Sequence, residues 1–132
     1  MSKTIIKHGN LVLEEQTMQA DLVIEHGIIT GITLDAQADG DCTVIDAAGK
    51  MVLPCMIDTH SHVTDPGPYN YREDWRCASR SAAAGGITTI ADMPLPSIAV
   101  LNKDRVAEKL QVVENSSVVD FALWGGVTPL NI

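Results

Sequence analysis

The residues best suited to chemistry are His60 and His62, one residue apart in the segment "IDTHSHVTDP". Side chains alternate along a β-strand, so residues two apart share a face, and Asp58 is expected on that face too. A pair of imidazoles fixed on a rigid strand suits zinc and similar divalent ions. Taken alone the spacing is weak, because two polar residues at a strand end can serve only their own hydrogen bonds. The surrounding sequence must therefore decide between a metal site and an ordinary strand end.

Other candidate ligands are few and less well placed. His8 and His26 lie beside glycines in expected turns, and neither is predicted to bind a metal. Asp92 follows a second apolar run; it either approaches the same end of the sheet or hydrogen-bonds the backbone before Pro94. Catalytic zinc generally uses about three protein ligands. The segment around His60 supplies two of them.

The composition excludes several classes of protein. The 132 residues carry a formal net charge of −8 with nine lysines and arginines, which is unlike a nucleic-acid-binding surface. No apolar stretch is long enough to span a bilayer and the start of the chain turns polar at once, so we expect no membrane partner and a cytoplasmic location. The cysteines, Cys42, Cys55 and Cys77, fit neither a disulfide framework nor a metal knuckle, and we expect free thiols.

The element pattern changes near residue 53. Residues 1–53 contain short β-rich runs separated by Gly9 and Gly27, each preceded by a histidine, which is typical of hairpins in a small antiparallel sheet. Residues 54–132 instead alternate between strand-like and helix-like segments. The expected order is a strand at 55–62, a helix at 70–84, a strand at 87–93, a helix from about 102 and a strand at 117–126.

This alternation predicts parallel strands connected by helices, in a sheet covered on both faces, with its chemistry at the carboxyl ends of the strands. Asn70 and Glu73 resemble a capping box at the start of the first helix, and the glycines at 85–86 are expected to end it. Lys103 and Lys109 belong to the second helix, outside the sheet, so no lysine is assigned to a metal.

Two longer stretches resemble the amidohydrolase superfamily, and within it the cyclic amidohydrolases. They are "VIDAAGKMVLPCMIDTHSHVTDPG" and "AAAGGITTIADMPL", and the resemblance covers essentially the whole chain. The segments "DMPL" and "LWGGVTPLNI" resemble the allantoinases in particular, with dihydropyrimidinases, other hydantoinases and dihydroorotases as alternatives. The resemblance implies that His60 and His62 are ligands of one divalent metal, most often zinc in this family. Cys55 stands where relatives usually have glycine, and a Cβ there introduces strain if that glycine serves a positive φ angle or tight packing. The Cys55 thiol is expected to be buried and inert, with a stray metal ligand as the alternative.

The resemblance also implies a fold and a reaction. The fold is α/β: residues 54–132 would be about three strands at the start of a (β/α)8 TIM barrel, and residues 1–53 would be part of a small β-sandwich, so the architecture is incomplete. The reaction is hydrolysis of a small cyclic amide, in allantoinases the opening of allantoin to allantoate in purine catabolism. The family uses two metals bridged by a hydroxide and a carboxylated lysine.

A barrel of this kind takes about 250 residues. The family's bridging lysine, two further histidines and a proton-shuttling aspartate lie on later strands, beyond this sequence. We therefore expect a truncated, inactive N-terminal portion with no catalytic residue of its own, unassigned substrate contacts and at most one weakly bound metal. Open sheet edges predict self-association. A non-catalytic interaction protein is the alternative of a different class.

Overall fold

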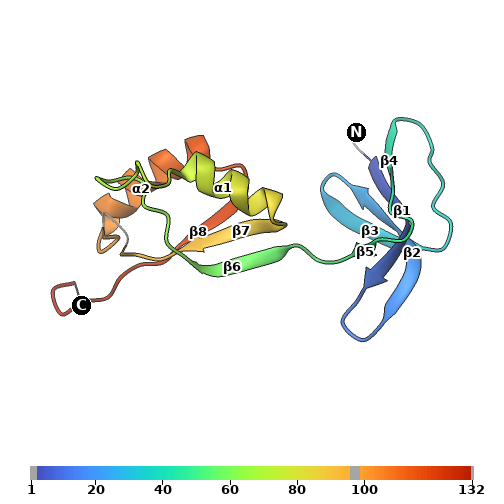
Figure 1. Ribbon diagram of the computed structural model, residues 1–132, viewed down its shortest axis with the longest axis horizontal. Coiled ribbons are helices and arrows are strands. Elements are labelled where there is room, and N and C mark those ends of the chain that lie inside the picture. The colour runs from blue at the N-terminus through green and yellow to red at the C-terminus, as the bar shows by residue number, and fades with distance from the viewer. Residues whose placement is uncertain (1–2, 96–98, 132) are drawn as a thin grey trace. The chain divides into compact units, whose positions relative to one another are not determined.

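The computed structural model describes residues 3–95 and 99–131. The chain divides into two compact units, Met1–Pro54 and Cys55–Ile132, which are described separately (Figure 1). No helix in the described ranges has both the length and the apolar character needed to cross a membrane.

The first unit is a five-stranded sheet built around its first strand. Its strands are β1 (Lys3–Val12), β2 (Thr17–Glu25), β3 (Ile28–Thr33), β4 (Cys42–Asp46) and β5 (Met51–Val52). β1 pairs antiparallel with β2 but parallel with β4 and β5, and β3 joins the outer edge of β2. The sheet is therefore mixed, and the prediction of an antiparallel sheet is wrong for β4 and β5, which run alongside β1 in its own direction.

The two glycines expected at hairpin turns have different roles. His26 and Gly27 form the two-residue turn between β2 and β3, with φ angles of 53° and 77°. Positive φ at both positions is what such a turn requires, so this hairpin is confirmed. Gly9, by contrast, lies inside β1. There the pairing with β2 shifts and His8 has a φ of 62°, so the expected turn is a bulge within a strand.

The second unit contains a parallel three-stranded sheet with two helices. Its elements are β6 (Met56–Ser61), α1 (Trp75–Ala84), β7 (Ile87–Asp92), α2 (Lys103–Ser116) and β8 (Asp120–Leu123). The strand order is β6-β7-β8 and both pairings are parallel, as the alternating pattern predicts. Three strands do not close a barrel. β6 and β8 are the outer strands, and self-association through such edges stays a prediction.

The helices α1 and α2 lie on the same face of this sheet (Figure 1). The core sits between them and the strands, and its buried members are Val63, Trp75, Ala78, Ile90 and Val113. Phe121 and Leu123 of β8 pack against this cluster from the sheet. The prediction of cover on both faces is therefore not met within residues 55–95 and 99–131, because both connections place their helix on one side.

The helix boundaries follow local capping, not the capping box expected at Asn70. The first helix begins at Trp75, where the carboxylate of Asp74 accepts a hydrogen bond from the Cys77 N–H at 2.7 Å. It ends at the expected glycines, with Gly86 at a φ of 86°. The second helix begins as expected, and Asn102 caps it by accepting from the Arg105 N–H at 3.0 Å.

Candidate metal centre

The end of β6 departs from regular strand alternation. Asp58 pairs with Ile90 of β7, and the next paired residue, Ser61, faces Asp92. β6 thus advances three residues while β7 advances two, which is a bulge. Because of this extra residue, Asp58 and Ser61 fall on the same face of the sheet, and the Ser61 hydroxyl donates to Asp58 Oδ2 at 2.6 Å.

His60 lies within this bulge and His62 just after it, and the two imidazoles lie together. The ring centroids of His60 and His62 are 5.3 Å apart with an interplanar angle of 61°, and both residues are exposed. Two imidazoles bound to one zinc ion at roughly 2.1 Å with tetrahedral angles have ring centroids about 5 Å apart. The pair therefore fits a shared ion. The same spacing is also typical of free edge-to-face rings, so the remaining donors matter.

Asp58 does not join the imidazoles, contrary to the expectation from strict alternation. Its Oδ1 accepts from the His60 N–H at 3.0 Å, and its Oδ2 is held by Ser61. The Ser61 hydroxyl and then the His60 N–H lower the pKa of Asp58, against the opposing effect of burial. The ionised carboxylate therefore fixes the backbone of the strand end. In residues 3–95 and 99–131, no three His, Cys, Asp or Glu side chains form a group suited to a metal ion.

The carboxylate of Asp92 is also occupied by other partners. Only 1% of Asp92 is exposed, and its Oδ1 accepts from the Val63 N–H at 2.6 Å. Its Oδ2 pairs with the ammonium of Lys109, which is 2% exposed. Asp92 therefore lies at the same end of the sheet as the imidazoles, as one expectation had it, but its carboxylate bonds to Val63 and Lys109 and not to the backbone before Pro94. Asp92 ties the residue after His62 to the core.

Lys109 is the residue that sequence reasoning placed wrongly. It was expected outside the sheet, yet it is buried beside Asp92. A signal was present in the helical spacing, because Lys109 lies three residues after Val106 and four before Val113, on the stripe that faces the core. A lysine on such a stripe requires a buried partner, and Asp92 is that partner.

The loop after His62 is anchored by its own polar groups. Asp65 Oδ2 accepts from the Trp75 N–H at 3.2 Å, and the Trp75 indole N–H donates to the Asp65 carbonyl at 3.0 Å. Asp65 therefore orders this loop. Trp75 is fully buried, so the loop is attached directly to the core under α1.

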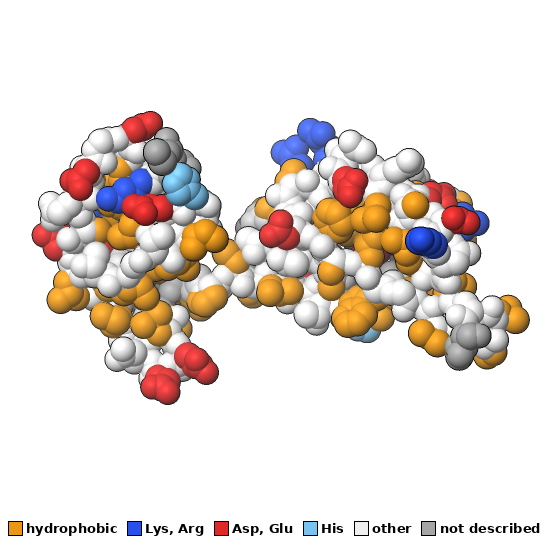
Figure 2. All heavy atoms as spheres, turned by 180° about the vertical axis from the view of Figure 1, so that it is seen from behind, with side chains coloured by type: hydrophobic (Ala, Val, Ile, Leu, Met, Phe, Trp, Pro, Cys, Tyr) orange, Lys and Arg blue, Asp and Glu red, His pale blue; other side chains and the backbone are white. Residues whose placement is uncertain are grey.

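Trp124 comes close to the imidazoles from the end of β8. Its backbone N–H donates to the Asp92 carbonyl at 2.9 Å, and its indole N–H donates to the Thr59 carbonyl at 3.1 Å. The side chain thus reaches back to the residue before His60, and 52% of it stays exposed. Sequence reasoning did not single out this tryptophan. Figure 2 shows exposed hydrophobic and histidine side chains at the edge of this unit away from the helices.

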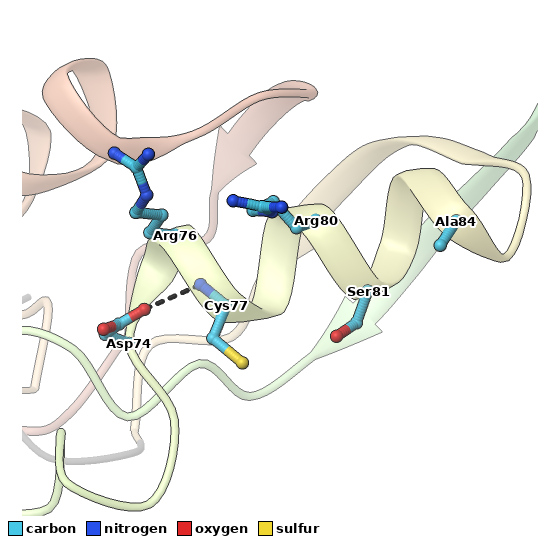
Figure 3. A pocket seen from close by; sticks show the side chains of 6 residues that line it. All are labelled: Asp74, Arg76, Cys77, Arg80, Ser81 and Ala84. Carbon is cyan, nitrogen blue, oxygen red and sulfur yellow. Dashed lines mark hydrogen bonds between the residues drawn. The ribbon is translucent and has the colours of Figure 1, made fainter.

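Among the described residues, two further hollows carry polar side chains. A cavity of about 190 Å³ lies under α1 and is bordered by Asp58, Ser61 and His62. A larger hollow on the α1 surface is lined by side chains that diverge: Arg76 and Arg80 project from one side of the helix, and Cys77 and Ser81 from the other (Figure 3). Its Asp74 is occupied as the helix cap, so these groups do not converge on a common point.

The free cysteines and the remaining histidines are also accounted for. Cys42, Cys55 and Cys77 are free thiols, as expected. Cys55 is exposed and is not at a positive φ angle, so the expected burial and the expected strain at a positive φ angle are both wrong. In the first unit, His8 Nδ1 is 3.0 Å from Asp46 Oδ1, and His26 is an exposed turn residue.

Comparison with known proteins identifies the relatives of this chain. The chain matches no protein-family model. It is 37% identical over 123 residues to a dihydroorotase of Methanosarcina mazei, covering 93% of this chain and 27% of that protein. It is 35% identical over 133 residues to an allantoinase of Bacillus licheniformis (98% and 29%) and 35% identical over 132 residues to an L-hydantoinase of Paenarthrobacter aurescens (100% and 29%).

Solved structures give the same result. L-hydantoinase from Arthrobacter aurescens superposes with a TM-score of 0.85 at 33% identity, covering 97% of this chain and 28% of that one. A D-hydantoinase gives 0.81 at 30% identity, covering 96% and 28%. The chain thus spans less than a third of the length of these relatives, whose names include three different activities. It belongs to the cyclic amidohydrolase family of allantoinases, dihydroorotases and hydantoinases, whose members are metal-dependent, and it corresponds to their N-terminal part.

Proposed function

We propose that this chain supplies the first metal-binding strand of a cyclic amidohydrolase, with His60 and His62 as ligands of one divalent ion. The observation that carries the proposal is the pair of exposed imidazoles at the carboxyl end of a parallel strand, with their ring centroids 5.3 Å apart. That end is where α/β proteins place their chemistry. Imidazole nitrogens favour zinc among the ions suited to hydrolysis.

The surrounding architecture supports the same proposal. β6, β7 and β8 with their helices are the proposed first βα units of a (β/α)8 barrel, and residues 1–53 are the proposed part of a β-sandwich. The helices cover one face of β6-β7-β8 (Figure 1), as in a barrel whose other face lines the interior. Ile57 of β6 is 64% exposed, which is consistent with a face that packs against further strands.

The proposed reaction is hydrolysis of a cyclic amide, with allantoin as the first substrate to test. Allantoinases recur among the relatives, and the "DMPL" and "LWGGVTPLNI" segments favour them. Hydantoins and dihydroorotate are the alternatives, since hydantoinases and dihydroorotases match equally well. A bound divalent ion would lower the pKa of its water and polarise the amide carbonyl.

The part that this chain plays is to hold the two imidazoles. His60 and His62 would bind the ion, while Asp58 fixes the backbone N–H of His60 and the Ser61 hydroxyl. The Trp124 indole holds the carbonyl of Thr59 from the other side. The described residues supply two ligands, whereas catalytic zinc generally uses about three. We therefore expect weak metal binding and no turnover by the 132-residue chain.

Metal content measured on the purified chain tests the ligand assignment. After equilibrium dialysis against zinc, we expect bound zinc in the wild-type chain and its loss in both His60→Ala and His62→Ala. His26→Ala is the matched control, because His26 is an exposed histidine in the other unit. Equal zinc content in all four proteins would contradict the assignment. Allantoin, hydantoin and dihydroorotate hydrolysis with added zinc should stay at background.

A further inference from the structure

We propose that Asp92 and Lys109 are positioning residues for the metal-binding strand end, acting through the backbone N–H of Val63, the residue after His62. The inference rests on the proposed function, because it takes His62 as a ligand. Neither side chain would touch the metal. Their effect would be to hold the His62 imidazole in one orientation beside His60, so that the two rings are ready to share an ion.

The first observation is that the peptide groups flanking His62 are both tied to β7. On one side, the Ser61 carbonyl accepts from the Met93 N–H at 2.8 Å. On the other side, the Val63 N–H donates to the carboxylate of Asp92 at 2.6 Å. His62 itself lies beyond the last residue of β6, where ladder hydrogen bonds no longer fix its backbone. The two bonds to Asp92 and Met93 replace that ladder.

The second observation is that the Asp92 carboxylate is buried and that both of its oxygens have partners. One oxygen of Asp92 holds Val63 and the other holds Lys109, and both charged residues are almost completely buried. Charged side chains are rarely buried unless they are paired. A buried ion pair is weak as a source of stability compared with apolar residues of the same volume, so stability alone does not account for it. An ionised acceptor does give the Val63 N–H a shorter and stronger hydrogen bond than a neutral one.

The third observation is that the pair links three elements at this point. Asp92 ends β7, Lys109 lies in the middle of α2, and the Lys109 ammonium is 6.0 Å from the ring centroid of Trp75 at the start of α1. Trp75 in turn holds Asp65, two residues after Val63. The loop after His62 is therefore fixed to β7, α1 and α2 together, and Asp92 is the member that contacts the backbone next to the ligand.

The test compares two double variants of the full chain that both remove the ion pair. In D92N/K109M the amide oxygen still accepts from the Val63 N–H, whereas in D92L/K109M no acceptor remains. Loss of a residue that supports a metal ligand typically weakens metal affinity about 10- to 100-fold. We therefore expect cobalt(II), titrated by visible absorption, to bind D92L/K109M at least about 10-fold more weakly than the wild type. D92N/K109M should stay within about 3-fold, because it keeps the hydrogen bond.

Val113→Ala is the control for a purely structural loss, because Val113 is buried on α2 but has no bond to the strand end. It should unfold at lower urea concentration yet bind cobalt normally while folded. The same behaviour in D92L/K109M would overturn the proposal. If D92L/K109M does not fold, D92A/K109M takes its place, and equal cobalt affinity in D92A/K109M and D92N/K109M would overturn it equally.

A metal-free readout separates this inference from the proposed function. Hydrogen exchange of the Val63 amide should be fast in D92L/K109M and slow in D92N/K109M, relative to the core amide of Ile90. If the wild type binds no cobalt at His62, the proposed function fails while the exchange result still tests the tie to Val63. Unchanged Val63 exchange in D92L/K109M would reject the positioning role whatever the metal result.

Discussion

Each unit of the chain contains a buried aspartate that holds an irregular piece of strand near a histidine. In the first unit, Asp21 accepts from the N–H of His8, in the bulge of β1, and from the N–H of Ala36. In the second unit, Asp92 accepts from the Val63 N–H next to His62 and pairs with Lys109. Both carboxylates satisfy backbone N–H groups that the ladder leaves free.

The two regions differ in what the held histidine does. His8 is engaged by Asp46 at 3.0 Å, whereas His62 lies beside His60 with both rings exposed. A buried carboxylate tied to the backbone is thus a way to hold a strand irregularity and is not itself a sign of a site. The distinguishing feature of the second unit is the pair of imidazoles. Variants that remove single contacts in each unit test this difference.

The largest expected effect is from Lys109→Met. It leaves the Asp92 carboxylate buried without a counter-charge, and breaking a buried pair in this way costs about 3–5 kcal/mol. The free energy of unfolding of the second unit, measured by urea denaturation, should fall by that amount. Lys103→Met on the exposed start of the same helix should change it by less than about 0.5 kcal/mol. Equal small effects for both would show that the buried pair does not form.

A smaller loss is expected from Asp21→Ala in the first unit. It leaves the N–H groups of His8 and Ala36 without their acceptor, which costs about 1–3 kcal/mol. The charge of Lys7 adds little, because Lys7 is 3.8 Å from Asp21 and partly exposed, so it is solvated when the carboxylate is removed. Urea denaturation followed by a probe in the first unit measures the change. Asp41→Ala, at an exposed position, is the control. A loss of stability in Asp21→Ala as large as that in Lys109→Met would remove the distinction between the units.

Much of the second unit was predictable from local patterns, and its failures are also local. The order of strands and helices, the parallel pairing and the helix start near residue 102 followed from periodicity, and the end of the first helix followed from its two glycines. The bulge between Asp58 and Ser61 did not, because side-chain alternation predicts a face only while a strand stays regular. It brings Asp58 and Ser61 onto the same face. The helix start predicted at Asn70 was wrong because Asp74 caps the helix instead.

The remaining failures involve contacts between distant residues. The parallel pairing of β4 and β5 with β1 depends on the path of the segment that connects β3 to β4. That segment, residues 34–41, contains no sequence pattern that predicts this path. Lys109 was assigned with the second helix to the outside of the sheet, without regard to its position on the apolar stripe. Its partner Asp92 is 17 residues away in sequence. The imidazole pair was predictable because its spacing of two residues is local.

Acid should weaken the folded state through Asp21 and Asp58. Burial opposes ionisation of Asp21, but the hydrogen bonds from His8 and Ala36 and the charge of Lys7 outweigh it and lower its pKa below 3.8; that of Asp58 is also lowered. A folded-state pKa below the unfolded-state value contributes stability at higher pH, and this stability is lost as the pH falls through the folded pKa. The urea midpoint should therefore decrease as the pH falls from about 4 toward 2.

Asp21→Asn isolates the contribution of the first unit to this pH dependence. Its midpoint should change less between pH 5 and pH 3 than that of the wild type, because an amide does not titrate. The response of the second unit, where Asp58 is unchanged, should stay the same. An identical pH dependence in both proteins would show that Asp21 does not titrate below its ordinary range in the folded state.

The smallest effect is expected from Trp124→Phe. It removes the indole N–H that donates to the Thr59 carbonyl but keeps an aromatic ring at a half-exposed position. One such hydrogen bond contributes about 0.5–1.5 kcal/mol, and exposure to water reduces the loss. Urea denaturation should show a change of at most about 1 kcal/mol. A loss comparable with that for Lys109→Met would make Trp124, not the buried pair, the main support of the strand end.

The central claim is that His60 and His62 act together on one ion and that the histidines of the first unit do not. Histidine-ring NMR during a zinc titration of the full chain compares all four rings in one sample. We predict that the ring nitrogens of His60 and His62 shift together and saturate at one zinc ion per chain, while those of His8 and His26 stay unchanged. Equal shifts of all four rings, or shifts of His60 and His62 at different zinc concentrations, would contradict the account.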